Sequence, residues 1–344
     1  MTVRVEVILF RRFILPRATS EFGIFPGKKS AHRHASHFMV EKLQNRTQGI
    51  SMSIKKIGII ANIEKEKSGE CTVQLRDWAI KKGIEVYLEE GIARKIGAGE
   101  GLDRRKLAAE VDLLVVLGGD GTILRTVRFV SEYDIPVVGI NLGEFGYLAE
   151  VNLSEMTSAL ELIVKGDYQT EKRMMLDITI YLGRETIREQ SILNDVVITR
   201  GNLSRILNLE TTVNNSYLTT FRADGIIIST PTGSTAHSLS AGGPIVFPEQ
   251  DSFIVNPICP FTLTNRPIII PNNAEIKVIM WTKGEGATVT LDGQVSHTMK
   301  SGDSVVIRKS PYVTNLVSSP HRDYMEILRT KLGWGGSPTG TNNL

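Results

Sequence analysis

The chain is poor in three features that would each indicate a particular class of protein. It has only two cysteines in 344 residues, Cys71 and Cys259, which give neither a disulfide framework nor a metal-ligand spacing and fit a reducing compartment. Its formal net charge of +3 is too small to indicate nucleic acid as a partner. No apolar run reaches the ~20 residues that span a bilayer. We therefore expect a cytoplasmic protein with neither nucleic acid nor membrane as a partner.

The first 51 residues differ in composition from the rest of the chain. They are basic and poor in acidic residues, which is typical of an organelle transit peptide. The plainer interpretation is an upstream extension that the working protein does not need, because a second methionine, Met52, leads directly into the first clear strand pattern. We favour this interpretation and expect residues 1–51 to be disordered or dispensable.

Residues 52–168 alternate between strand patterns and helix patterns. Continuous aliphatic runs predict buried parallel strands, and amphipathic stretches between them predict helices. The expected strands are 57–61, 84–88, 111–117 and 136–140, the expected helices are about 73–83, 122–132 and 154–164, and a glycine-containing loop is expected at 97–101. This alternation predicts an α/β domain with a Rossmann-like parallel sheet.

Residues 169–318 read instead as short strands without helices between them, which predicts a second, mainly-β domain. The expected strands are 175–182, 192–199, 207–213, 225–229, 267–270, 276–281, 287–291 and 304–307. Residues 319–344 are expected to form a short helix that returns to the α/β domain, followed by a disordered tail.

A glycine-rich turn, Gly118–Thr122, follows the strand expected at 111–117. Glycine permits positive φ and lets a ligand approach the main-chain amides closely, and N–H groups at a helix N-terminus favour phosphate. Asp120 is unexpected there because its carboxylate repels phosphate. It indicates either chemistry, as a base or a metal ligand, or simply a helix cap. The next strand also ends in a glycine-rich loop, Asn141–Leu148, and ligands of open parallel sheets bind where such loops meet.

Two polar stretches of the β half are further candidates for a site. Asn194 and Asp195 interrupt an apolar strand, as either a bulge or a pair that binds a sugar or a base edge. The segment Ser229–Gly243, which we call the hydroxyl-rich loop, offers many small donors and acceptors suited to ribose and phosphate. A catalytic pair of Ser234 and His237 is disfavoured because the G-x-S-x-G turn of such enzymes is absent.

Two further turns are less informative in isolation. Arg266, in the loop Pro257–Pro267, suits either a phosphate or a structural carboxylate. The tripeptide Asp292–Gln294 is typical of a hairpin turn.

Together these stretches are similar to the NAD kinase family, ATP-dependent enzymes that convert NAD to NADP. The matching motifs are GGDGT at Gly118–Thr122, N-x-G-x-x-G at Asn141–Gly146, L-N-D at Leu193–Asp195, the hydroxyl-rich loop, P-I-C-P at Pro257–Pro260 and D-G-Q at Asp292–Gln294. They occur in the family's order and span roughly residues 54–320. GGDGT alone is shared with diacylglycerol-type and sphingosine-type lipid kinases.

The resemblance implies a role for each matching residue. Asp120 would be the base that takes the proton from the 2′-hydroxyl of the adenosine ribose. The phosphate-binding residues would be Gly118, Gly119, Gly121, Thr122 and Arg125. The NAD-binding residues would be Asp120, Gly121, Tyr147, Asn194, Asp195, Asp224, Thr232, Thr235, Ala236, His237 and Ser240, with Asp224 near the nicotinamide end.

The resemblance also implies a phosphoryl donor, a cation and an assembly. The donor would be ATP, with polyphosphate left open, and a divalent cation, Mg²⁺ by expectation, would accompany it on ligands that the sequence does not identify. Family members are usually dimers or tetramers whose pocket a neighbouring subunit completes. Two other functions remain as alternatives: a diacylglycerol-type lipid kinase and a non-catalytic NAD(P) sensor.

Three positions depart from the family pattern. His237 stands where Tyr is common, Phe261 where His is common and Tyr147 where Phe is common. None of them is the proposed base, so we expect activity to survive. We expect these departures to change the affinity for NAD and the choice between NAD and NADH.

Overall fold

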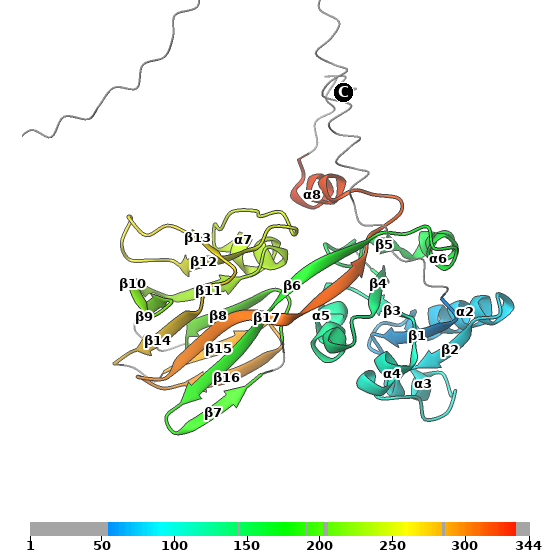
Figure 1. Ribbon diagram of the computed structural model, residues 1–344, viewed down its shortest axis with the longest axis horizontal. Helices are drawn as coiled ribbons and strands as arrows, with labels where there is room; N and C mark the ends of the chain where they lie inside the picture. The colour runs from blue at the N-terminus through cyan, green and yellow to red at the C-terminus, as the bar shows by residue number, and fades with distance from the viewer. Residues whose placement is uncertain (1–53, 144, 190, 202–205, 284–285, 335–344) are drawn as a thin grey trace, which may run out of the picture. The chain divides into compact units, whose positions relative to one another are not determined.

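The computed structural model describes residues 54–143, 145–189, 191–201, 206–283 and 286–334. The predicted extension at 1–51 and the predicted tail beyond Trp334 lie outside these residues. Within them, an α/β half and a mainly-β half are joined by long strands (Figure 1). The predicted fold class is therefore confirmed. No helix in this part of the chain is long and apolar enough to cross a membrane.

The α/β half is built on a parallel sheet in the order β2-β1-β3-β4. Its central strand β3 is buried along its whole length, as its aliphatic run predicts. The strands are β1 Lys56–Ala61, β2 Glu85–Leu88, β3 Leu113–Gly118, β4 Pro136–Asn141 and the short β5 Val151–Asn152. The helices are α2 Ser68–Lys81, α3 Glu90–Lys95, α4 Arg104–Glu110, α5 Asp120–Val130 and α6 Met156–Val164.

Both faces of this sheet are covered by helices. Leu75 of α2 and Leu160 of α6 belong to the core on one face, whereas Leu107 of α4 and Ile123 of α5 belong to the core on the other. The sequence did not indicate α3 and α4, because each spans only two turns or fewer. Their N-termini are nevertheless encoded locally, since the side chains of Glu89 and Asp103 accept main-chain N–H bonds there.

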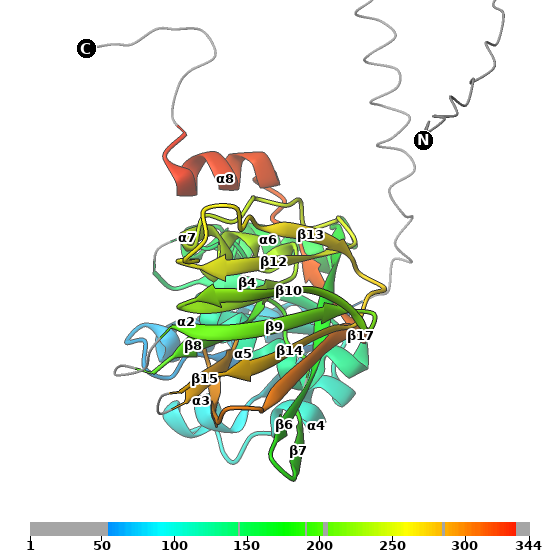
Figure 2. The same ribbon diagram turned by 90° about the vertical axis from the view of Figure 1, so that its left-hand side faces the viewer.

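The β half packs two mainly antiparallel sheets around one apolar core (Figure 2). One sheet has the order β13-β12-β11-β8-β15-β16, and the other contributes β10-β9-β14-β17, with β6 beside β17 and β7 beside β6. The strands are β6 Thr170–Leu182, β7 Glu185–Arg188, β8 Asp195–Arg200, β9 Leu207–Val213, β10 Ser216–Ala223, β11 Gly225–Ser229, β12 Ser252–Ile258, β13 Ile268–Pro271, β14 Ile276–Trp281, β15 Ala287–Leu291, β16 Val295–Met299 and β17 Ser304–Val317.

Strand β17 connects the two halves. It pairs with β6 over most of its length, and near its end Asn315 and Leu316 pair in parallel with β4 of the α/β half. The predicted strand at 304–307 was therefore about ten residues too short. A register shift between Lys309 and Val313, across a polar stretch, conceals the second part of the strand from its sequence pattern.

The last helix, α8 Tyr324–Leu332, begins at a cap and ends at a left-handed glycine. The Asp323 side chain accepts the N–H of Glu326 at 2.7 Å, and Gly333 has a φ of 64°. Just before the helix, Arg322 forms two hydrogen bonds with the carboxylate of Glu155, which precedes α6. The ring of Tyr324 packs against that of Phe247, with centroids 5.5 Å apart.

Candidate active site at the glycine turn

The glycine turn joins β3 directly to α5. Gly118 is the last residue of β3, Gly119 is the N-cap, and Asp120 is the first helical residue. The expectation of positive φ was wrong, because none of Gly118, Gly119 and Gly121 has a positive φ. Their small size is what the fold uses. A Cβ on Gly118 would overlap the side chain of Thr122, whereas a Cβ on Gly119 or Gly121 would meet nothing within 4 Å. The turn therefore leaves open space beside its amides.

The carboxylate of Asp120 binds the main chain of the loop that follows β4. Oδ1 accepts the N–H groups of Leu148 at 3.0 Å and Ala149 at 2.9 Å, and Oδ2 accepts that of Tyr147 at 2.9 Å. A Cβ on Gly146 would overlap this carboxylate. The Asp120 side chain therefore does not cap the helix but holds the two glycine-rich loops together. Because Oδ2 accepts a single N–H in this network, it keeps a lone pair for a proton.

Tyr147 lies beside this carboxylate. Burial raises the pKa of its phenol, and the charge of Asp120 adds to that effect. The ammonium of Lys331, from α8, lies 6.0 Å from the centre of the Tyr147 ring. The aromatic residue predicted to contact NAD is thus held next to the predicted base.

Asn194 and Asp195 are positioned by the carboxylate of Asp292. It accepts the N–H groups of Leu193 at 3.0 Å, Asn194 at 2.8 Å and Asp195 at 3.1 Å. Asp292 itself is buried, and burial raises its pKa to about 6, although the three N–H bonds oppose that change. The tripeptide Asp292–Gln294 does form the β15–β16 hairpin turn, as predicted. That Asp292 also anchors a second segment was not predicted, because only the fold brings positions 194 and 292 together.

The hydroxyl-rich loop packs against the same two residues. The Thr230 hydroxyl donates to the carbonyl of Leu193 at 2.6 Å, and that of Ser229 to the carbonyl of Asn194 at 3.2 Å. A Cβ on Gly233 would overlap the Asn194 carbonyl. The loop then forms a 3-10 turn, η3 Thr232–Thr235, and a short helix, α7 His237–Ser240, with Ala236 between them.

His237 faces Asp195 from the start of α7. Its Nδ1 lies 3.1 Å from Oδ1 and 3.3 Å from Oδ2 of this fully buried carboxylate. The hydrogen bond to Asp195 raises the pKa of His237, and partial burial opposes the change. Ser234, the other member of the disfavoured catalytic pair, instead bonds the main chain of Val246 in both directions. No Ser–His contact therefore forms.

Gln294 connects this cluster to the glycine turn. Its Nε2 donates to the carbonyl of Gly121 at 2.8 Å, which joins the hairpin of the β half to the first turn of α5. Three buried polar atoms in this region have no hydrogen-bond partner among the described residues: Asn194 Oδ1, Thr232 Oγ1 and Gln294 Oε1. Two are amide oxygens and one is a hydroxyl, so they suit a ligand that carries hydroxyl or amino donors.

Not every predicted site residue joins this cluster. Asp224 pairs with Arg200 at 2.9 Å and precedes β11, whereas the cluster lies at the other end of that strand, roughly 16 Å away at ~3.3 Å per residue. Arg125 is exposed one turn after Gly121, and Ser240 is exposed at the end of α7. Arg266 donates to carbonyls of its own loop, at Leu263 and Asn265, rather than to a structural carboxylate.

Phe261, which departs from the family pattern, lies at the surface. The Phe261 ring is two-thirds exposed, and the guanidinium of Arg222 lies 4.9 Å from its centre. Within the described residues, no group of three or more His, Cys, Asp or Glu side chains is arranged to hold a metal ion. A cation at this site would therefore need most of its ligands from a bound molecule.

Family models and individual proteins match the chain over the same region. Residues 57–168 match the model of the ATP-NAD kinase N-terminal domain, and residues 193–319 that of the ATP-NAD kinase C-terminal domain. A protein named NAD kinase from Geotalea daltonii is 45% identical over 82% of this chain and 99% of its own length. A protein named NAD kinase from Caldanaerobacter subterraneus is 40% identical over 81% of this chain and 99% of its own length.

Solved structures give the same result. The yeast NADH kinase complexed with NADH has a TM-score of 0.76 and 25% identity, and covers 83% of this chain and 89% of its own. An NAD kinase from Archaeoglobus fulgidus in complex with ATP has a TM-score of 0.66 and covers 82% of this chain and 100% of its own. Because its sequence identity is only 23%, it supports the fold alone. The relatives and both domain models agree with the motifs described above, and the chain belongs to the NAD kinase family.

Proposed function

We propose that the protein transfers the γ-phosphoryl group of ATP to the 2′-hydroxyl of the adenosine ribose of NAD, giving NADP and ADP. The observation that carries this proposal is the junction at Gly121. There an open, glycine-lined helix start meets a cluster with three unpartnered polar atoms, and Gln294 bonds the two together. A phosphate-binding turn and a ribose-binding cluster are the two parts that this reaction needs.

Asp120 would act as the general base. An alcohol is a poor nucleophile, and a positioned base contributes about 10²–10⁴-fold to such a reaction. The three N–H bonds from 147–149 fix the orientation of the carboxylate, and the remaining lone pair of Oδ2 would accept the 2′-hydroxyl proton. The hydroxyl oxygen then bonds the γ-phosphorus, the bond from the bridging oxygen to the γ-phosphorus breaks, and ADP leaves.

The NAD would be held by the residues around Asn194. Its ribose hydroxyls would donate to Asn194 Oδ1 and Thr232 Oγ1, which have no other partner among the described residues. Thr235, Ala236 and Ser240 would line the pocket, and Tyr147 and His237 would offer their ring faces to a base. The amides beside Gly119 and Gly121 would bind phosphates, because no side chain closes that space.

A divalent cation, Mg²⁺ by our proposal, would neutralise charge on the transferred phosphoryl group. Mg²⁺ commonly takes one or two protein carboxylates and completes its shell with phosphates and waters. Asp120 is already engaged by three N–H bonds and by its proposed role as base, and no all-protein metal cluster occurs in the described ranges, so the cation would take its ligands mainly from the phosphates of ATP and from water.

We also propose a cytoplasmic homo-oligomer, a dimer or tetramer. Tyr217 of β10 and Trp281 of β14 lie in the sheet β10-β9-β14-β17, with about 64% and 43% of their surfaces exposed. Exposed aromatic side chains on this sheet favour a face that another subunit covers. A neighbouring subunit would also give Asp224 a place at a pocket from which it is remote within its own chain. Size-exclusion chromatography with light scattering measures this directly, and a monomer at micromolar concentration would contradict it.

The reaction is tested by assaying the purified chain with each acceptor and donor separately. We expect NADP from NAD, ATP and Mg²⁺, and no phosphatidic acid from a diacylglycerol. Parallel reactions with NADH and with polyphosphate define the acceptor form and the donor. Phosphorylation of the diacylglycerol instead would favour a lipid kinase, and binding of NADP by calorimetry without turnover would favour a sensor.

A further inference from the structure

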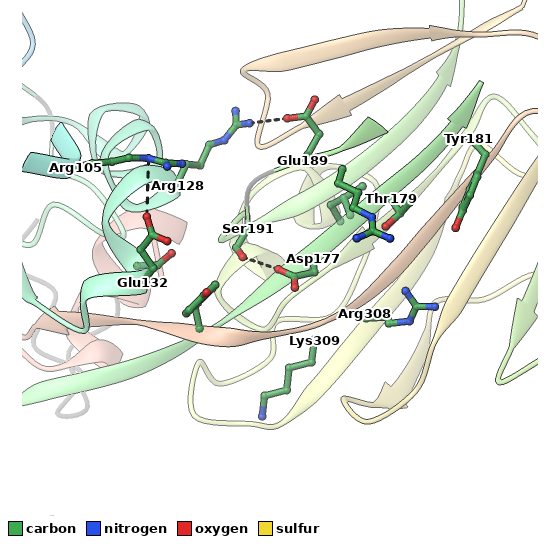
Figure 3. A pocket seen from close by; sticks show the side chains of 14 residues that line it. Arg105, Arg128, Glu132, Asp177, Thr179, Tyr181, Glu189, Ser191, Arg308 and Lys309 are labelled. Atoms are coloured by element: carbon green, nitrogen blue, oxygen red, sulfur yellow. Dashed lines mark hydrogen bonds and ion pairs between the residues drawn. The ribbon is translucent and has the colours of Figure 1, made fainter. Parts of the chain in front are cut away.

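A cavity lies at the opposite end of α5 from Asp120. It has a volume of about 570 Å³ and is formed by the ends of α4 and α5 on one side and by β6, β7 and β17 on the other (Figure 3). Arg128 is eight residues after Asp120, which places it ~12 Å farther along the helix. The proposed active site uses none of the residues that line this cavity.

The lining carries more positive than negative side chains. Three carboxylates, Glu132, Asp177 and Glu189, face five cationic residues: Arg105, Arg128, Arg188, Arg308 and Lys309. Of the outer cations, Arg308 is held by two hydrogen bonds to Glu275, whereas Arg105 and Lys309 are engaged by exposed partners. Arg105 is half exposed and lies 3.9 Å from Glu132, and Lys309 pairs with the exposed Asp251. Such exposed pairs contribute little to stability, so they yield readily to a ligand.

Arg188 is the least engaged of these cations. It is exposed on β7, directly opposite Thr179 of β6, which also lines the cavity. Neither a hydrogen bond nor an ion pair to it occurs among the residues that the structure describes. A guanidinium in this state can take an anion without breaking an existing contact.

Arg128 is the buried member of the group. Only 8% of its surface is exposed, and its Nε has no hydrogen-bond partner within the described ranges. The ion pair that Arg128 forms with Glu189 is long at 3.4 Å, and Glu189 is engaged more closely by His297 at 2.6 Å. A buried guanidinium with an unsatisfied N–H is costly, so this one is incompletely partnered in the structure described.

The cavity is also placed where the sheet is irregular. The register shift of β17 between Lys309 and Val313 lies along its wall, and Tyr312 of that segment lines it. Ser191, on the cavity wall, is bonded to Asp177 at 2.5 Å and to Ser310 at 2.7 Å. The irregular segment is therefore fixed by specific contacts, as is usual where a bulge re-aims side chains toward a site.

We propose that this cavity binds a small phosphorylated anion, whose phosphoryl group takes Arg128 Nε and the guanidinium of Arg188 as its main donors. Arginine pairs bidentately with phosphate oxygens, and the space exceeds that of a phosphate alone. The hydroxyl of Thr179 and the rings of Tyr181 and Tyr312 would contact the organic part. This inference does not depend on the reaction proposed above.

Calorimetric titration of the full chain with inorganic pyrophosphate tests this site. The chain is first saturated with NAD and a non-hydrolysable ATP analogue, so that the glycine turn is occupied. We expect one further pyrophosphate per chain, with affinity that falls as salt rises. Arg188→Gln and Arg128→Lys should each weaken it about tenfold or more, because each removes part of a charge-assisted, bidentate contact.

The control is Arg94→Gln, which removes another exposed positive charge on α3, away from the cavity. It should leave the affinity for pyrophosphate unchanged. Citrate, titrated in the same way, distinguishes a phosphate site from a general carboxylate site, and binding of citrate as tight as that of pyrophosphate would overturn the assignment of ligand class. Absence of the extra binding event, or equal weakening by Arg94→Gln and Arg188→Gln, would overturn the site itself.

Discussion

The side-chain amide of Gln294 donates a hydrogen bond to the main-chain carbonyl of Gly121 at 2.8 Å. The two residues belong to different halves of the chain, a β hairpin and the start of α5. Gly121 follows the proposed base, and Gln294 is the last residue of the turn whose Asp292 holds Asn194 and Asp195. This bond therefore links the residue next to the proposed base with the hairpin that anchors the cluster proposed to hold its substrate.

Replacing Gln294 tests that connection. Gln294→Ala removes one hydrogen bond of about 1 kcal/mol, so we expect kcat/KM for NAD to fall about fivefold while the melting temperature changes little. Gln74→Ala, an exposed change on α2, is the control. Unchanged kinetics in Gln294→Ala would show that the bond does not position the reactants.

Alanine substitutions in the turn should affect ligand binding at Gly121 and stability at Gly118. Gly121→Ala should fold with near wild-type stability, because its Cβ meets nothing within 4 Å, yet it should bind ATP and NAD several-fold more weakly. Gly118→Ala should instead lower the melting temperature, since its Cβ would overlap Thr122. Thermal denaturation and calorimetry measure both quantities. Wild-type binding by Gly121→Ala would mean that the open space is not a ligand site.

Glu150 should give the protein a pH-dependent stability. It is buried, accepts the N–H of Ser319 at 2.9 Å, and burial raises its pKa from 4.5 to about 7. Below pH 4.5 the carboxyl is protonated in both folded and unfolded chains. Between pH 4.5 and 7 only the unfolded chain loses its proton, so stability falls as pH rises, by about 3 kcal/mol in total.

The variant Glu150→Gln removes this titration while it keeps an acceptor for Ser319. The loss of unfolding free energy between pH 4.5 and 7 should therefore be about 3 kcal/mol smaller in the variant than in the wild type. Chemical denaturation across that range measures it, with the exposed Glu110→Gln as control. Parallel curves for Glu150→Gln and wild type would show that Glu150 stays ionised in the folded chain.

His237 should also make stability fall as pH rises, but over a higher range of pH and through an ion pair rather than burial. The hydrogen bond to Asp195 raises its pKa above 6.5, and Asp292 adds a smaller effect of the same direction. Its contribution to stability is thus fully present below pH 6.5 and is lost as pH rises through the folded pKa. His237→Gln should be destabilised more at pH 6 than at pH 9. A constant difference in melting temperature between those values would contradict the pairing.

The sequence predicted those parts of the fold that local pattern determines. The buried run before Gly118 was correctly predicted as a strand, because its aliphatic composition is a local signal. The hydroxyl-rich loop is ordered, with a 3-10 turn and a short helix, and its place in the site stays a prediction. Strand β17 was read too short, since its second part lies beyond a polar register shift. The turn at Asp292 was recognised, but its role as an anchor was not, because its N–H partners lie about a hundred residues away in the sequence.

The same distinction applies to the site. Gly118–Thr122 was identified from its residues, yet the reason offered for two of its glycines, positive φ, was wrong. Only the fold shows that Gly118 makes room for Thr122 and that the space beside Gly121 is open. Likewise, no pattern in the sequence indicates that Asp120 binds the loop at 147–149, because both loops had to be placed at the same sheet edge first.

The most direct test of this account is NADP formation by Asp120→Asn beside the wild type, with NAD binding measured on the same samples. Asparagine keeps an oxygen for Leu148 and Ala149 but cannot take a proton from the ribose. We predict that the variant binds NAD within a few-fold of wild type while kcat falls by about 10²–10⁴-fold. Full activity in Asp120→Asn would contradict the assignment of Asp120 as the base.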